Sequence, residues 1–182
     1  MIRSRYIFIP VLLLIVSCSH HYRSDKMDLG FYQWNLWIDE EAGTDTALGT
    51  HDPSCGWEPM KLGVGKLVRI PTLVGDQFPE GTAGAAWYHC RFSLPDLWDK
   101  SDVSIQFDSV NGNTEVYLNG ELAASQPKTD KPFSLDLSGK IYYTRDNHIA
   151  IRIISEDPRK TGIAGKVNLK SDYLAEPPQS EP

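Results

Sequence analysis

The chain has 182 residues, with 18 Lys and Arg against 24 Asp and Glu, and 41% of its residues are hydrophobic. This hydrophobic content in a chain of this length predicts one globular domain and excludes an intrinsically disordered protein. A complete (β/α)8 barrel needs about 250 residues in its usual form, so we do not expect one. The formal net charge of -6 argues against nucleic acid as a partner, because phosphate binding depends mainly on clustered Lys and Arg.

The N-terminal segment has the features of a secretory signal. Two arginines precede an apolar run over 6–16 that is too short to span a bilayer comfortably. The run ends on Ile15-Val16-Ser17-Cys18, which resembles a bacterial lipobox, so we predict a signal peptide over 1–17 and lipidation of Cys18. With Ser19 in the next position, the resemblance implies a lipid-anchored protein of the bacterial cell envelope, at the outer membrane. An uncleaved signal anchor and a simple secreted protein are the alternatives.

Two further cysteines, Cys55 and Cys90, follow the lipobox. A disulfide between them would close a loop of about 35 residues and stabilise the fold by about 4 kcal/mol in the chain-entropy model. Two separate buried thiols fit the sequence equally well, since pairing requires a geometry that spacing does not supply. The sequence is compatible with both alternatives.

The remaining chain divides into a polar tether over 18–28, one folded domain over 29–170 and a Pro-rich disordered tail over 171–182. No window of the domain keeps a helical period for three turns, whereas apolar and polar residues often alternate, as in half-buried strands. Asn119-Gly120 predicts a two-residue hairpin turn. Short strands separated by turns, without helices, predict an all-β antiparallel sandwich. The expected strands cover 31–38, 66–70, 87–94, 103–107, 115–118, 121–123, 133–137, 149–153 and 166–170.

Six segments of the chain follow one another in the order and spacing of a known protein family. They are GAAWYHCRF at 84–92, IQFDSVN at 105–111, VYLNG at 116–120, PF with DL at 132–137, DNHIAIR at 146–152, and GI with Val167 at 162–167. Together they resemble the N-terminal sugar-binding domain of the family 2 glycoside hydrolases, which include β-galactosidases, β-glucuronidases and β-mannosidases. The resemblance implies a galactose-binding-domain-like jelly roll, in agreement with the strand pattern.

The same resemblance bears on catalysis. In this family the catalytic glutamates lie on a separate barrel, for which the chain has no room, so we predict that the protein is not an enzyme. Glycoside hydrolysis needs two carboxyl groups on either side of the glycosidic bond. The carboxylates Asp108, Glu115 and Glu121 are instead expected on solvated strand faces and turns, where most acidic residues lie.

Candidate sugar contacts follow from the resemblance and from residue type. Asn111 matches an asparagine that can reach a sugar hydroxyl in β-galactosidase-like members, and an amide both donates and accepts hydrogen bonds. Asn113 lies in the same loop, although Asn is common in turns for conformational reasons alone. Trp34 and Trp57 are candidates for stacking on a sugar ring, while large aromatic side chains more often pack in cores. Trp34 and Trp37 are expected on opposite faces of one strand.

No cofactor is predicted. The histidines lack metal-ligand spacing, no Cys-x-x-Cys pair is present, and no Gly-x-Ser-x-Gly elbow occurs. A cluster of acidic residues could hold a structural calcium, but a solvated acidic loop explains it and the order of an EF-hand is absent. The cluster consists of Asp39, Glu40, Glu41 and Asp45.

Two functions fit the sequence. In the first, the chain is a non-catalytic, lipid-anchored carbohydrate-binding module with a glycan as its ligand. In the second, it is a structural or protein-interaction sandwich that has lost sugar binding, or the accessory subunit of a separately encoded glycosidase. Exposed aromatic residues beside Asn111 would favour the first function.

Overall fold

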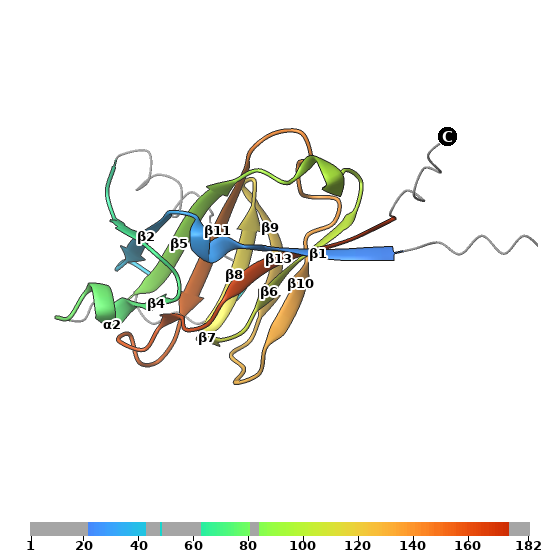
Figure 1. Ribbon diagram of the computed structural model, residues 1–182. Helices are drawn as coiled ribbons and strands as arrows, with labels where there is room; N and C mark the ends of the chain where they lie inside the picture. Colours follow the sequence, from blue (N-terminus) through green and yellow to red (C-terminus); the bar gives the residue numbers. More distant parts are fainter. Residues whose placement is uncertain (1–21, 43–47, 49–62, 81–83, 175–182) are drawn as a thin grey trace, which may run out of the picture.

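The computed structural model describes residues 22–42, 48, 63–80 and 84–174. They form two larger antiparallel sheets that pack face to face and one short sheet at an end of the sandwich (Figure 1). This confirms the predicted all-β antiparallel sandwich.

The strands are arranged in three sheets. Sheet A has the order β1 (Tyr22–Asp28), β13 (Val167–Leu174), β6 (Asp102–Phe107) and β10 (Phe133–Asp136). Sheet B has the order β3 (Lys66–Val68), β2 (Trp34–Asp39), β5 (Ala85–Phe92), β11 (Asn147–Ile154), β8 (Asn113–Leu118) and β9 (Glu121–Gln126). Sheet C has the order β4 (Thr72–Leu73), β12 (Gly162–Ile163) and β7 (Val110–Asn111). The helical turns are η1 (Leu29–Phe31), α2 (Val74–Gln77) and η2 (Asp96–Trp98).

Strand β1 corrects the predicted domain boundaries. The expected tether over 18–28 is wrong for residues 22–28, because β1 pairs with β13 from Tyr22↔Leu174 to Asp28↔Asn168. The domain therefore spans 22–174 and not 29–170, and residues 171–174, expected in the tail, belong to β13. The signal peptide, Cys18 and residues 175–182 lie outside the described residues.

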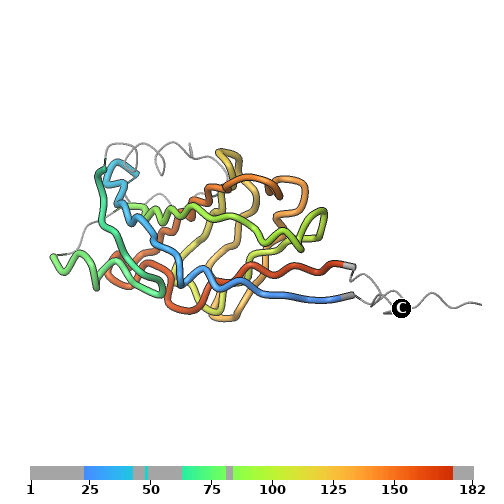
Figure 2. The backbone as a smooth tube through the Cα atoms, turned by 45° about the horizontal axis from the view of Figure 1, so that its top comes forward, coloured from blue at the N-terminus to red at the C-terminus, as the bar shows by residue number. Residues whose placement is uncertain are grey.

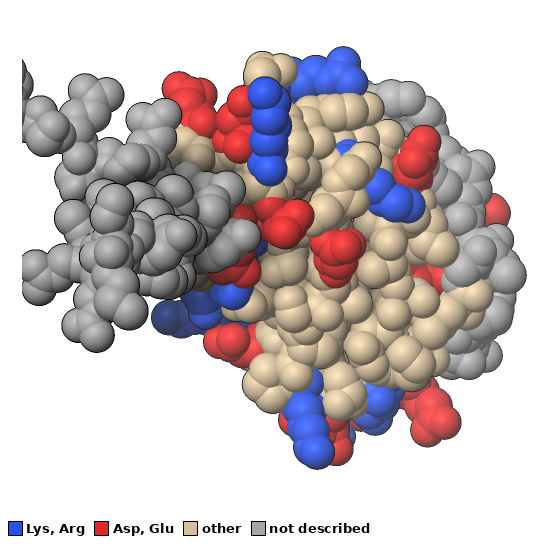
Figure 3. Space-filling view, turned by 90° about the vertical axis from the view of Figure 1, so that its right-hand side faces the viewer, with Lys and Arg blue, Asp and Glu red and all other residues tan. Residues whose placement is uncertain are grey.

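The ends of β1 and β13 form a two-stranded ribbon. The register of β13 with β6 ends at Asp172↔Asp102, while its pairing with β1 continues to Leu174. The two strands run side by side away from the other strands in both views (Figures 1 and 2). Seen from the side on which the ribbon ends, Lys and Arg side chains lie among Asp and Glu side chains, with neutral residues between them (Figure 3). No helix within the described residues is long and apolar enough to cross a membrane.

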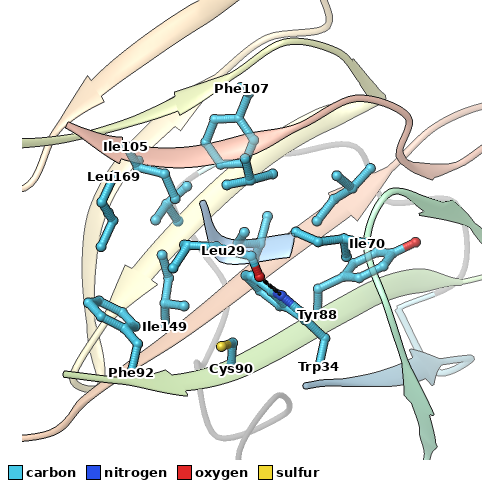
Figure 4. Close-up of a cluster of buried hydrophobic side chains, with 14 of the residues drawn as sticks. Leu29, Trp34, Ile70, Tyr88, Cys90, Phe92, Ile105, Phe107, Ile149 and Leu169 are labelled. Atoms are coloured by element: carbon cyan, nitrogen blue, oxygen red, sulfur yellow. Dashed lines mark hydrogen bonds between the residues drawn. The ribbon is translucent and has the colours of Figure 1, made fainter. Parts of the chain in front are cut away.

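The main core fills the space between sheets A and B. Val103, Ile105 and Phe107 of β6 are buried while the residues between them are more exposed, which confirms the alternation expected there. Leu29, Trp34, Ile105, Phe107, Ile149 and Leu169 point toward one another in the interior (Figure 4).

The central strands of sheet B are buried on both faces, which corrects the expected half-burial. In β5 every residue except Arg91 is buried, and β11 is buried from Ile149 to Ile154. The reason is a second hydrophobic cluster on the outer face of sheet B, the face turned away from sheet A. It consists of Ala85, Trp87, Tyr117, Ala150 and Ile154, with Trp37, Ala42 and Leu122 packed against it.

The hairpin predicted at Asn119-Gly120 is confirmed between β8 and β9. Asn119 has φ 54° and Gly120 has φ 94°, the positive values that a tight hairpin turn requires. Asn119 does more than turn the chain: its Nδ2 donates to the Lys140 carbonyl (3.1 Å) and its Oδ1 accepts from the His148 N–H (3.0 Å). The asparagine thereby ties the turn to the start of β11.

Candidate functional site

Asn111, the first predicted sugar contact, lies in the short sheet C. Its backbone pairs with Gly162 of β12, and its side chain is half-buried. The backbones approach closely here, since a Cβ on Gly112 would lie 2.6 Å from the Ile154 carbonyl oxygen. Asn111 is thus held in a tightly packed strand.

Asn113, the second predicted sugar contact, has a structural partner. Its Oδ1 accepts a hydrogen bond from the backbone N–H of Lys128 at 2.8 Å. This bond fastens the segment after β9 to the start of β8. This hydrogen bond fits the alternative role of Asn113 in the conformation of the chain.

Trp34 is a correction, because it cannot stack on a sugar. Its side chain is fully buried between the sheets, and its Nε1 donates to the Leu29 carbonyl at 2.9 Å (Figure 4). The register of β2 places Trp34 opposite Cys90 on the face directed into the core. The other predicted stacking residue, Trp57, lies outside the described residues.

Cys90 is a free, buried thiol. Burial raises its pKa to about 12, because the interior disfavours a thiolate. The disulfide reading is therefore not supported at Cys90, and the alternative of a separate thiol describes this residue. Cys55 lies outside the described residues.

A cavity of about 830 Å³ opens where β2 ends; we call it the β2 cavity. Its lining combines two aromatic rings, three carboxylates and one ammonium group with backbone and apolar atoms. Gly65 has φ 96°, and a Cβ there would lie 2.9 Å from the Leu36 carbonyl oxygen, so only glycine allows the chain to pass this close. The side chains that give the cavity its chemistry are Trp37, Asp39, Glu40, Glu41, Lys66 and Phe78.

The aromatic and charged groups of the β2 cavity are positioned by neighbours. Trp37 is half-buried on the outer face of sheet B, opposite to the core-facing Trp34, as expected from strand alternation. The Lys66 ammonium lies 4.3 Å from the centroid of the Phe78 ring and donates to a backbone carbonyl of α2. Asp39 Oδ1 accepts from the Ala42 N–H at 3.2 Å.

The acidic cluster that suggested calcium forms one wall of this cavity. Within the described ranges, no group of three or more His, Cys, Asp or Glu residues is arranged to hold a metal ion. Asp45 of the predicted cluster lies outside those ranges.

The outer face of sheet B also contains a buried ion pair that the sequence pattern did not predict. The strand registers place Trp37, Trp87, Arg152 and Glu115 in one row across β2, β5, β11 and β8. Arg152 Nη1 lies 3.4 Å from Glu115 Oε2, and the two side chains are 1% and 0% exposed. The expectation of a solvated strand face is therefore wrong for Glu115. A carboxylate that is buried and paired with a guanidinium is not available as an acid or base for a substrate in solvent.

A pair of histidines lies further along this face, with His89 one row beyond Trp87 and His148 two rows beyond Arg152. His148 Nδ1 and His89 Nε2 are 3.3 Å apart, and the centroids of the two rings are 5.4 Å apart. Burial, together with the neighbouring His148, lowers the pKa of His89 to about 4. His89 is therefore a neutral side chain in the folded protein at neutral pH.

The chain resembles one domain of the family 2 glycoside hydrolases in both sequence and fold. It is 33% identical to a β-galactosidase of Bacteroides ovatus, BoGH2A, over 98 residues, which cover 48% of this chain and 11% of that enzyme. It is 31% identical to a β-glucuronidase of Formosa agariphila over 70 residues, which cover 38% of this chain and 7% of that protein. No protein-family model matches the chain.

Solved structures show the same likeness over most of the chain. A β-glucuronidase of Ruminococcus gnavus in complex with D-glucuronic acid superimposes with a TM-score of 0.64 at 19% identity, covering 87% of this chain and 30% of that one. A family 2 glycosyl hydrolase of Bacteroides cellulosilyticus gives a TM-score of 0.60 at 17% identity, covering 80% of this chain and 20% of that one. These identities establish the fold alone.

The extent of the match is itself informative. The chain spans about a tenth of the length of the curated relatives it matches and less than a third of the solved chains. The resemblance to a single β-sandwich domain of these enzymes, predicted from six sequence segments, is thereby confirmed. Their catalytic domain has no counterpart within the matched part.

Proposed function

We propose that this chain is a non-catalytic carbohydrate-binding domain that takes a sugar in the β2 cavity. The observation that carries the proposal is the combination of the Trp37 and Phe78 rings with Asp39, Glu40 and Glu41 in one cavity. Aromatic rings offer a large apolar surface to the C–H face of a sugar. Carboxylates accept strong hydrogen bonds from its hydroxyl groups.

The dimensions of the cavity support a small ligand. Its volume of about 830 Å³ lies within the range of about 300–1,000 Å³ typical of small-molecule sites, which are largely apolar with a few convergent polar groups. The relatives support a carbohydrate in particular, because they are named as a β-galactosidase and β-glucuronidases.

The arrangement of the carboxylates supports binding without hydrolysis. Glycosidases place one carboxyl group on each side of the bond that is cleaved. Asp39, Glu40 and Glu41 are consecutive in the chain at the end of β2, and Glu115 is buried with Arg152. The described residues of the β2 cavity thus offer acceptors from one segment and an ammonium, Lys66, from another.

The binding test compares one aromatic position inside the cavity with one outside it. Affinity electrophoresis of the full chain in gels that contain single polysaccharides should show retardation by at least one of them. Trp37→Ala should abolish the retardation, because it removes the stacking surface of the cavity. Phe31→Ala is the matched control, since Phe31 is 80% exposed and lies outside the cavity.

Other outcomes would overturn the proposal in different ways. Loss of retardation in Asn111→Ala but not in Trp37→Ala would indicate that the sugar site lies at sheet C. Absence of retardation on every polysaccharide would refute carbohydrate binding and favour the protein-interaction alternative.

We further propose that a lipid on Cys18 anchors this domain in the bacterial cell envelope, at the outer membrane. The support is the lipobox-like sequence and the apolar run before it. Cells fed with labelled palmitate should incorporate the label into the wild-type chain and not into Cys18→Ser. Equal incorporation in both would refute the anchor.

A further inference from the structure

We infer that the β2 cavity selects amino sugars and neutral sugars against uronic acids, an inference that rests on the sugar-binding function proposed above. Among the residues that the structure describes, the lining of the cavity includes three acidic residues, Asp39, Glu40 and Glu41, and one basic residue, Lys66. A bound uronic acid would bring a fourth carboxylate into this surrounding. A bound amino sugar would bring a cation.

Lys66 is already engaged by the protein. Its Nζ donates to the backbone carbonyl of Gln77 and lies over the ring of Phe78 at 4.3 Å from the centroid. Within the described part of the chain, the ion pairs do not include one between Lys66 and the three carboxylates. To pair with a uronate, the ammonium would have to give up its contacts at the end of α2.

The carboxylates of the β2 cavity would repel a bound uronate. Asp39 is held by the Ala42 N–H, while Glu40 and Glu41 have exposed side chains that can turn toward a ligand. Coulomb repulsion in a partly desolvated concave site exceeds the repulsion in bulk water several-fold. Because two of the carboxylates are exposed, salt should weaken the effect.

The sugar bound by a structurally similar enzyme does not predict which sugar this chain binds. A β-glucuronidase with a similar fold holds D-glucuronic acid, but it is 19% identical to this chain. Specificity resides in the side chains of a site and not in the fold that carries it. The charges that line the β2 cavity predict the opposite preference.

The experiment uses three trisaccharides with the same β-1,4 linkage, built from glucosamine, glucose or glucuronic acid. Calorimetric titration of the full chain at pH 6 in about 20 mM salt should rank glucosamine first, glucose second and glucuronic acid last. We expect the dissociation constants of the first and the last to differ at least tenfold, equivalent to about 1.4 kcal/mol. In about 300 mM salt the ratio should shrink.

A charge-neutralising variant and its control locate the effect. Glu40→Gln with Glu41→Gln should reduce the ratio between the affinities for glucosamine and glucuronic acid at least threefold, because it removes two of the three negative charges that line the cavity. Glu121→Gln with Glu156→Gln makes the same change of net charge at two exposed positions outside the cavity, and should leave the ratio as in the wild type. An equal effect of both double variants would assign the preference to the overall charge and overturn the inference.

The remaining outcomes separate the two proposals. If the glucose trisaccharide binds in the β2 cavity and the glucuronic acid trisaccharide binds equally or more tightly, the selectivity is wrong while the proposed function stands. The selectivity is also wrong if the glucosamine trisaccharide binds no more tightly than the glucose one. If none of the three binds, the result counts against the proposed function, and the selectivity falls with it.

Discussion

The ion pair between Glu115 and Arg152 offers the sharpest test of how the outer face of sheet B is stabilised. Both side chains are buried, Arg152 Nη1 lies 3.4 Å from Glu115 Oε2, and the Tyr117 hydroxyl donates to the same oxygen at 3.0 Å. Replacing Glu115 by leucine would remove this carboxylate from beside the buried guanidinium. We expect Glu115→Leu to lower the free energy of unfolding by about 3–5 kcal/mol.

The distance supports this magnitude. Two unit charges at 3.4 Å attract by about 5 kcal/mol at an effective dielectric constant of about 20, before desolvation is subtracted. A domain of this kind has a total stability of about 5–15 kcal/mol. The variant should therefore retain between none and about four fifths of the native stability, a change that equilibrium unfolding resolves easily.

Urea unfolding followed by tryptophan fluorescence measures the effect. Glu121→Leu is the control, because Glu121 is exposed at the start of β9, and a surface substitution of this kind should stay within about 0.5 kcal/mol. The double variant Glu115→Leu with Arg152→Met should recover most of the loss, since it leaves no unpaired charge in the interior. A cost below about 1 kcal/mol for Glu115→Leu, or a double variant no more stable than the single one, would refute the reasoning.

Three other measurements probe the interior. Burial lowers the pKa of His89 to about 4, against about 6.5 in an unfolded chain. Because the unfolded state therefore binds the extra proton, the free energy of unfolding should fall by up to about 3 kcal/mol as the pH drops from 6.5 through 4. In His89→Gln the urea midpoint should depend less on pH across that window, and an unchanged pH dependence would contradict the assignment. Gly162→Ala should lower the melting temperature strongly, because its Cβ would lie 2.4 Å from a buried tyrosine hydroxyl at φ 139°, whereas Gly120→Ala, with open space around it, should cost only the roughly 1–2 kcal/mol of a left-handed backbone; equal melting temperatures would argue against the close packing at sheet C. Cys90 should react with a thiol reagent only after unfolding, and recovery of a Cys55–Cys90 cross-linked peptide from the native protein would show that the free thiol is wrong.

Local sequence signals predicted the elements in which one face is buried. The alternation of Val103, Ile105 and Phe107 located β6, and Asn119-Gly120 located the turn between β8 and β9. Strand β1 was missed, because its sequence from Tyr22 to Asp28 is largely polar. Its strand conformation is fixed by the hydrogen-bonded ladder with β13, a non-local pairing that leaves little hydrophobic pattern in its own residues.

Part of the candidate site could have been predicted from the sequence. Trp34 shares its face with Leu36 and Ile38, whereas Trp37 shares its face with Asn35 and Asp39. Alternation therefore could have indicated Trp37, and not Trp34, as the tryptophan away from the main core. The burial of Glu115 could not be predicted in this way, because it depends on the register that aligns β8 with β11.

The ribbon formed by β1 and β13 has a mechanical consequence for a lipid-anchored chain. Tyr22, where β1 begins, follows Cys18 by four residues, which can span at most about 14 Å even when fully extended. An acylated Cys18 would thus place the free end of the ribbon close to the bilayer, and the paired strands would act as a short spacer between the bilayer and the sandwich. The β2 end of sheet B lies on the opposite side of the sandwich from the free end of the ribbon (Figure 1). The spacer would therefore direct the β2 cavity away from the bilayer, where long polysaccharides could reach it.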